Sequence, residues 1–341
     1  MTPAEKIGVM PRGRAATSRM LAAPLIRAAV ALALVIAVGM IFHADGAFFK
    51  AATHRDALRQ ASVFGILACG MTVVVISGGI DLAVGSILAF VAVSFSIMSL
   101  WWQWPAGAAV VASLAVGTTC GAISGWLIAI LRLQPFIATL AMMVFARGLA
   151  KTFSGGTKVS TAIPQPGGSF QYAQIPEVFR WIDSRTLGGN VSVVTMIFAV
   201  TLLVSWIVLE RHRWGRELYA IGGNEEAARL SGVPVALSKT LAYAFSGLTA
   251  AVAALCQAAQ EQQGDPEAAA GYELTAIAIV VVGGTTLTGA RGGIGFTLIG
   301  TITIGYLDKI LSINAVPEAS RLMLTGAIIV AAVLAQRRGR T

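Results

Sequence analysis

The chain has 341 residues, of which 56% are hydrophobic and only 12% are charged, and its mean hydropathy is +0.76. One soluble core of this length needs far fewer apolar side chains, so the composition excludes an ordinary soluble domain and indicates an integral membrane protein. The net charge of +9 does not indicate nucleic-acid binding, because the basic residues lie at the chain ends and in loops between apolar segments.

About ten apolar segments are each long enough to cross a bilayer as a helix, which takes about 20 mainly apolar residues. Helices are expected because every backbone polar group must be satisfied inside the segment where there is no water. The sequence therefore predicts an all-α, polytopic membrane protein. The predicted spans are residues 25–42, 63–79, 82–100, 106–130, 135–150, 191–209, 239–259, 273–288, 293–313 and 320–335.

The basic residues indicate how the chain is oriented. Arg132, the group at 211–216 and Arg291 fall in short loops on the same side as both chain ends. The positive-inside rule therefore predicts that both termini are cytoplasmic. The expected parts are a basic tail over 1–24, a transmembrane domain over 25–336 and a second basic tail over 337–341.

Two loops on the opposite side also carry bases, within 43–62 and 151–190. The second loop is long, and long loops weigh less in the orientation of a chain. Within the first, residues 48–62 fit an amphipathic helix that lies in the membrane interface with its bases at the headgroups.

The segment 222–234, GGNEEAARLSGVP, is a short charged stretch between two apolar spans. Its two glycines end an irregular approach, Asn224 is a good N-cap, and two glutamates follow in the first turn, where the helix dipole favours negative charge. Gly232 suits a left-handed C-terminal cap, and Pro234 prevents continuation. The pattern predicts a separately capped helix of about seven residues, which is either a contact for a partner protein or a solvated connector.

The stretch EAARLSG at 226–232 resembles the Glu-Ala-Ala…Gly pattern of the cytoplasmic coupling loop in permease subunits of bacterial ATP-binding-cassette (ABC) importers. Three wider blocks in the same order are similar to the ribose/simple-sugar branch of that group, and the resemblance runs from about residue 45 to the C-terminus. The Ile-x-Leu-Pro ending found in other importer classes is missing, and VPVALSK stands in its place. The blocks are SGGIDLAVGSILAF (77–90), residues 219–255 and YELTAIAIVVVGGTTLTGARGG (272–293).

The resemblance implies a permease of the vitamin B12/ribose type in the bacterial inner membrane, which imports a monosaccharide or similar small sugar. It implies three partners: a cytoplasmic ATP-binding subunit, a periplasmic or extracellular sugar-binding protein, and a second permease subunit, identical or different. Within a coupling loop at about 210–238, the implied coupling residues are Gly223, Asn224, Glu225, Glu226, Ala227, Ala228, Arg229 and Gly232. The chain itself is expected to be no enzyme, because GGTK at 155–158 lacks the spacing of a phosphate-binding loop.

Two apolar runs echo each other, VVVISGGIDL at 73–82 and AIVVVGGTTL at 278–287. Glycine-interrupted spans in two parts of a transporter indicate a site built from broken helices. Close helix packing through small residues is the alternative, and Asp81 has the alternative of capping the helix that follows it. The candidate pathway residues are Gly78, Gly79, Asp81, Gly283, Gly284 and Thr285.

The alternative function is an ion-coupled secondary transporter of a small polar solute, which would use acids inside the membrane. Asp81 is the one clear candidate for such an acid. The three cysteines and three histidines are dispersed along the chain, so we expect no metal site and no cofactor. The same dispersal argues against an intramembrane enzyme.

Overall fold

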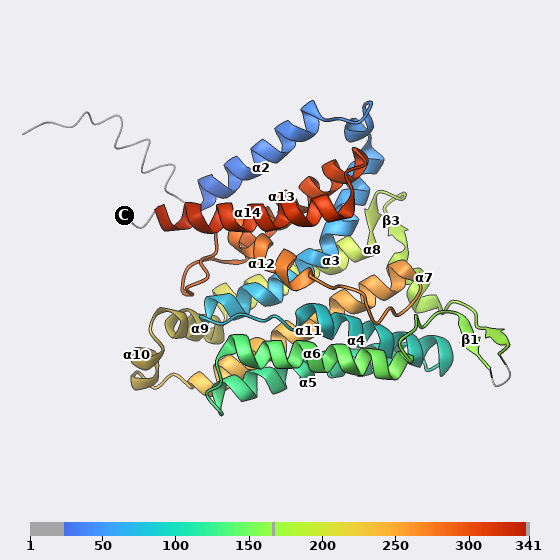
Figure 1. Ribbon diagram of the computed structural model, residues 1–341. Helices are drawn as coiled ribbons and strands as arrows, with labels where there is room; N and C mark the ends of the chain where they lie inside the picture. The colour runs from blue at the N-terminus through green and yellow to red at the C-terminus, as the bar shows by residue number, and fades with distance from the viewer. Residues whose placement is uncertain (1–23, 166–167, 339–341) are drawn as a thin grey trace, which may run out of the picture.

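The computed structural model describes residues 24–165 and 168–338 (Figure 1). Long helices run between two ends of the molecule, one carrying α9 Arg213–Gly223 and α10 Glu225–Leu230, the other carrying α7 Glu177–Asp183 and short strands. The long helices are α2 Pro24–Ile41, α3 Ala51–Ile76, α4 Val84–Ser96, α5 Ala106–Ala129, α6 Pro135–Ser154, α8 Val193–Trp206, α11 Val235–Glu261, α12 Tyr272–Gly283, α13 Ile294–Ile313 and α14 Glu318–Arg338. The predicted tails lie almost wholly outside the described residues.

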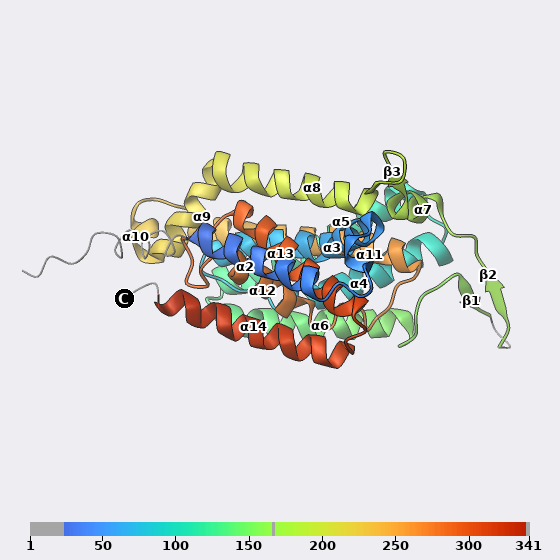
Figure 2. The ribbon, with the colours of Figure 1, turned by 90° about the horizontal axis from the view of Figure 1, so that it is seen from above.

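Seven of the described helices are long and apolar enough to cross a membrane, and α2 and α12 are shorter apolar helices. In the spanning windows of α3 and α4, 83% and 89% of residues are buried, against 28% in those of α5, α6 and α8. The first two therefore form the centre of the bundle and the other three face its surroundings. Figure 2 shows α8 and α14 on opposite flanks, with α2, α3 and α13 between them.

Helices α5 and α11 pack closely through glycines spaced four residues apart. A Cβ added at Gly121 would lie 2.1 Å from the carbonyl oxygen of Tyr243, and one added at Gly125 would lie 2.8 Å from that of Thr240. Small residues at this spacing let two backbones approach, which is how helices associate where lipid removes the hydrophobic driving force.

The predicted spans agree with the helices, with two corrections. Helix α3 begins at Ala51 and is continuous, so residues 48–62 are not a separate interfacial helix. Its polar first turns are paired with the 183–190 segment: Arg59 forms an ion pair with Asp183, and Asp56 forms one with Arg185. Helix α12 ends at Gly283 rather than at 288, because Gly284 has a left-handed φ of +115°.

Short elements complete both ends. Strand β1 Ala162–Pro164 pairs antiparallel with β2 Phe170–Tyr172, and β3 Arg185–Thr186 with β4 Val191–Ser192. The π-helical turns η2 Ile97–Trp101 and η3 Ile207–Arg211 extend α4 and α8, and the 3-10 turn η1 Ala47–Phe49 precedes α3. Helix α7 is anchored by Phe179, whose buried ring stacks on that of Phe95 with centroids 4.9 Å apart.

Candidate functional site

The predicted capped helix is α10, with six residues from Glu225 to Leu230. The side chain of Asn224 accepts a hydrogen bond from the backbone N–H of Ala227 at 3.0 Å, which satisfies one free donor of the first turn. Gly232 has a φ of +83°, and the N–H of Val233 closes the end by donating to the carbonyl of Ala228. The local sequence therefore fixes both ends of this helix.

Helix α10 is attached on one face and open on the other. Ala228 is buried, and Lys239 at the start of α11 forms an ion pair with Glu225 at 2.5 Å. On the open face Glu226 pairs with Arg229 at 2.6 Å, and Leu230 is 80% exposed. An exposed large apolar side chain beside an exposed ion pair is a surface that another protein can cover.

The residues before α10 are helical, so the expected irregular approach was wrong. Helix α9 continues through both glycines to Gly223. Its first turns are fixed to α11, because the Trp214 indole N–H donates to the Ser238 carbonyl and the Ser238 hydroxyl donates to Glu217. A hollow of about 330 Å³ lies between α9 and the end of α10, lined by Arg213, Arg216, Glu217, Ala220, Ser231, Gly232 and Val233.

The end of α9 contacts both glycine-containing breaks of the bundle. A Cβ added at Gly222 would lie 1.9 Å from the carbonyl oxygen of Ile76, at the end of α3, and 2.8 Å from the N–H nitrogen of Ala290. The Ala290 N–H donates to that same carbonyl at 3.0 Å. A Cβ added at Gly289 would lie 3.1 Å from the Cα atoms of both Gly222 and Gly78. Only glycine at 222 permits this meeting of three backbones.

The first break is residues 77–83, between α3 and α4, and it contains three of the candidate pathway residues. Gly78 has a φ of +80°, and a Cβ at Gly79 would lie 2.3 Å from the Tyr243 hydroxyl oxygen. Asp81 is fully buried and accepts hydrogen bonds from the Ser246 hydroxyl at 2.7 Å and from the Ala83 N–H at 3.0 Å. Asp81 does not cap α4, whose N-cap is Ala83 without a side-chain bond; it closes the turn before that helix and ties it to Ser246, and a pathway role stays a prediction.

The second break is residues 284–293, between α12 and α13. A Cβ at Gly283 would lie 2.1 Å from the carbonyl oxygen of Phe296, so α12 and α13 touch here through their backbones. Thr285 is buried against Gly292, where an added Cβ would lie 2.4 Å from the threonine side chain. The contacts are those of close helix packing, and a pathway role for Gly283, Gly284 and Thr285 also stays a prediction.

The Tyr219 side chain connects α9 to the second break. Its hydroxyl donates to the carbonyl of Gly292 at 3.0 Å. Burial raises the pKa of this phenol, and the nearby carboxylate of Glu210 raises it further. The hydroxyl therefore keeps its proton and remains a donor at neutral pH.

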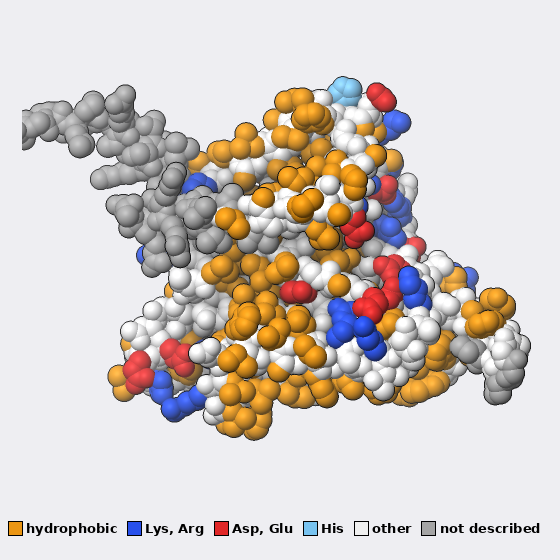
Figure 3. Space-filling model, viewed as in Figure 1, with side chains coloured by type: hydrophobic (Ala, Val, Ile, Leu, Met, Phe, Trp, Pro, Cys, Tyr) orange, Lys and Arg blue, Asp and Glu red, His pale blue; other side chains and the backbone are white. Residues whose placement is uncertain are grey.

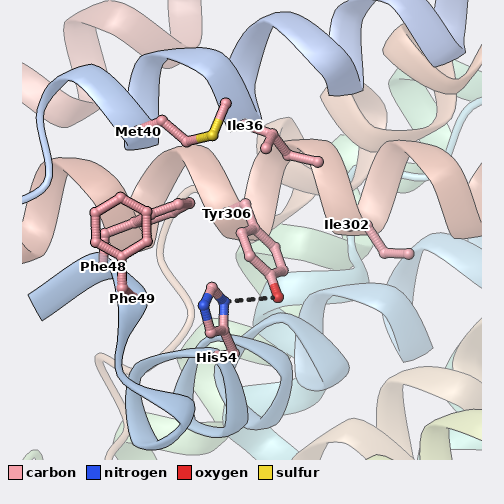
Figure 4. A pocket seen from close by; sticks show the side chains of 7 residues that line it. All are labelled: Ile36, Met40, Phe48, Phe49, His54, Ile302 and Tyr306. Carbon is pink, nitrogen blue, oxygen red and sulfur yellow. Dashed lines mark hydrogen bonds between the residues drawn. The ribbon is translucent and has the colours of Figure 1, made fainter.

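A groove of about 370 Å³ lies between α2, η1, α3 and α13, and Figure 4 shows the side chains that line it. The His54 Nδ1 lies 3.2 Å from the Tyr306 hydroxyl oxygen, and the two rings are stacked. The other lining residues are Ile36, Met40, Phe48, Phe49 and Ile302. With one polar pair among apolar side chains, the groove offers little to a hydroxyl-rich solute. No cluster of three metal-ligating side chains occurs among the residues that the structure describes.

Comparison with known proteins places the chain in a family. The sequence profile of the family described as "Branched-chain amino acid transport system / permease component" matches residues 55–333. The chain belongs to this permease family. The ribose import permease RbsC of Escherichia coli (strain K12) is 37% identical to this permease over 309 residues, which cover 90% of the chain and 92% of RbsC.

Other relatives match this permease over a similar share of both chains. RbsC of Bacillus subtilis (strain 168) is 36% identical and covers 90% of the chain and 91% of that protein. The xylose transport system permease XylH of E. coli (strain K12) is 32% identical, with coverage of 89% and 90%. No solved structure matches the chain. The family and its multiple apolar helices establish a multi-pass inner-membrane transport subunit.

Proposed function

We propose that this chain is the membrane-spanning subunit of an ATP-driven importer for a monosaccharide or similar small sugar. The observation that carries the proposal is the match over nine tenths of the chain to permeases named for ribose and xylose. Helix α10, with its open face of Glu226, Arg229 and Leu230, is the contact through which an ATP-binding subunit acts on this chain in the proposal. The ion-coupled alternative is not favoured, since Asp81 is fully buried with both carboxylate oxygens hydrogen-bonded.

Three partners complete the transporter in this proposal. A cytoplasmic ATP-binding subunit covers the open face of α10, a soluble sugar-binding protein docks at the opposite end, and a second permease subunit completes the pathway. The end bearing α9 and α10, and with it both termini, is cytoplasmic. The exposed side chains of Arg132, Arg216 and Arg291 at this end support that orientation.

Force from ATP hydrolysis passes through few contacts in this proposal. A push on α10 moves α9, because the two helices share the junction at Asn224. The close approach of Gly222 to Ile76 and Ala290 then carries the displacement to both breaks. Packed backbones transmit such shifts because they cannot be compressed.

The coupling role of α10 is tested by Glu226→Lys. The variant replaces the ion pair with Arg229 by a repulsion on the open face, and the helix remains capped by Asn224. We expect membrane insertion to be normal and ATP-driven uptake to fall about tenfold or more, because charge reversal at an interface costs several kcal/mol. The measurement is uptake, with co-purification of the ATP-binding subunit.

The matched control is Glu177→Lys, the same charge reversal on α7 at the opposite end of the molecule, where Glu177 is exposed. This variant should keep the ATP-binding subunit bound. Uptake by Glu226→Lys equal to that of the unmodified protein would remove α10 from the coupling mechanism.

Orientation is tested by labelling single cysteines with a reagent that does not cross membranes. The three native cysteines are buried, so a cysteine introduced at an exposed position is the accessible thiol. In membranes made without the ATP-binding subunit, Leu230→Cys on α10 should react in inverted vesicles, and Tyr172→Cys on β2, 75% exposed, should react in intact spheroplasts. The reverse pattern would contradict the proposed orientation.

A further inference from the structure

A cavity of about 250 Å³ lies between α3, α12, α13 and α14, in the half of the molecule away from α10. Unlike the groove at His54, it combines rings with charged and hydroxyl groups. Phe64 and Tyr272 are packed with ring centroids 4.5 Å apart and planes at 55°. Arg321 donates to Asp308 at 3.0 Å, and Glu318, Thr275 and Thr325 complete the polar lining.

The surface around this cavity is unusual for a helix bundle in lipid. Figure 3 shows acidic and basic side chains on this face beside a wide apolar area. Asp308 lies in the last two turns of α13, and Glu318 and Arg321 lie in the first turn of α14. The charged lining of the cavity is therefore near the ends of these helices, where water can reach it more easily than at the bilayer centre.

Two features indicate a bound solute rather than a closed ion-pair network. The Nε of Arg321 is buried and has no hydrogen-bond partner among the described atoms, so a donor is left for an oxygen of a ligand or of water. The Tyr272 ring, packed on Phe64, lines the same cavity as the carboxylates of Asp308 and Glu318. Hydroxyl groups of a ligand are the natural donors to such carboxylates.

The charge and size of the cavity select a class of solute. The two acids Asp308 and Glu318 outnumber the base Arg321, which disfavours phosphates and other anions. A cation site is not formed, because the described residues contain no cluster of three metal-ligating side chains. Pockets for drug-sized ligands hold about 300–1,000 Å³, so this smaller cavity fits a solute of monosaccharide size.

We propose that this cavity is a weak acceptor site on the permease for a neutral sugar released at the outer face. The proposal rests on the proposed function in taking a sugar as the transported solute. Tyr272 and Phe64 pack against the apolar face of the sugar ring, Asp308 and Glu318 accept from its hydroxyl groups, and the Nε–H of Arg321 donates to a hydroxyl oxygen. Weak binding suits a transfer site, because a solute held tightly is released slowly.

The test uses the permease with its ATP-binding subunit in lipid nanodiscs and the probes D-ribose and D-xylose. Saturation-transfer NMR should give saturable binding of at least one sugar below about 100 mM. Tyr272→Ala should weaken it about tenfold, since it removes both ring contact and hydroxyl, whereas Tyr272→Phe should weaken it only about threefold. Size-exclusion profiles and ATP hydrolysis establish that each variant is folded.

Two further variants keep the result decisive. Tyr306→Phe alters a tyrosine that lines the apolar groove instead and should leave sugar binding unchanged. Thr325→Cys should bind sugar until a bulky thiol reagent fills the cavity, after which binding should be lost. No saturable signal, an unchanged signal in Tyr272→Ala, or binding of L-leucine in place of the sugars would overturn the proposed site.

Uptake into proteoliposomes with the sugar-binding protein separates the two proposals. Import of ribose or xylose without binding in the cavity would remove the site and leave the proposed function intact. Import of neither sugar would remove the proposed function as well.

Discussion

The first and second breaks share a sequence pattern but are attached to different parts of the molecule. The first break is fastened to α11, where Ser246 donates to Asp81 and the Tyr243 hydroxyl donates to the carbonyl of Ile80 at 3.2 Å. The second is fastened to α9, through Tyr219 and through the approach of Gly289 to Gly222. The two breaks thus have similar sequences but different attachments: the first is held by α11, and the second is linked to α9.

The difference teaches that a repeated pattern indicates only local chain geometry. A Gly-Gly pair breaks a helix in both places, because glycine readily takes a left-handed conformation, as Gly78 and Gly284 do. Asp81 in the first break is held by Ser246, more than a hundred positions away in the sequence, whereas Gly292 in the second break is held by Tyr219 on a nearer helix. The neighbour that holds each break therefore does not follow from the repeated pattern. We therefore expect displacement of α9 to move the second break more than the first.

The variant with the largest expected effect is Gly222→Ala, which acts where the two breaks meet. Its Cβ would collide with the backbone of Ile76, which cannot give way as a flexible side chain can. We expect ATP-driven uptake to fall about tenfold or more, because the three backbones must separate.

The matched control for that variant is a helical glycine without such a contact. A Cβ at Gly148 in α6 would meet nothing within 4 Å, so Gly148→Ala should transport normally. Equal uptake by the two variants would show that α9 does not act through this contact.

Next in size is the effect of Asp81→Leu on the attachment of the first break. The Ser246 hydroxyl and the Ala83 N–H would lose their buried acceptor, which costs about 3 kcal/mol in unfolding free energy. We expect a clearly lower melting temperature in detergent. Ser246→Ala keeps the bond to Ala83 and should lose less. A melting temperature unchanged by Asp81→Leu would mean that the carboxylate does not hold this break.

A smaller effect is expected from two tyrosines that make equivalent bonds to the two breaks. Tyr219→Phe and Tyr243→Phe each remove one hydrogen bond to a carbonyl, worth about 1 kcal/mol. If α9 drives the second break, Tyr219→Phe should lower the uptake per ATP hydrolysed by about two- to fivefold. Tyr243→Phe should lower only thermal stability. Identical coupling ratios in the two variants would argue against distinct roles.

The sequence predicted the bundle well, because apolar length determines which segments span the membrane. It also predicted α10, since Asn224, Gly232 and Pro234 specify a start and a stop within the segment itself. Signals of this kind are local, and a single sequence contains all of them.

The remaining features depend on tertiary contact. Helix α9 was missed because two glycines at its end suggested a break, whereas Gly222 is needed for its close approach to Ile76. The cavity residues Phe64, Tyr272 and Arg321 come from separate helices, and no spacing along the chain connects them. The polar start of α3 looked interfacial because its partner Asp183 is distant in sequence.

The smallest effect is expected from Lys239→Met, which tests whether α10 also acts on the first break through α11. Lys239 and Glu225 form the one ion pair between α10 and α11 among the described residues, but the Glu225 side chain is 46% exposed. A solvated pair that salt screens contributes at the low end of the range of about 0.2–1 kcal/mol. Uptake should therefore change less than about twofold, while α9 still carries the displacement. The contrary outcome is a large loss of uptake by Lys239→Met at low salt, without a matching loss in the unmodified protein at high salt. That outcome would place α11, and so the first break, on the route of coupling.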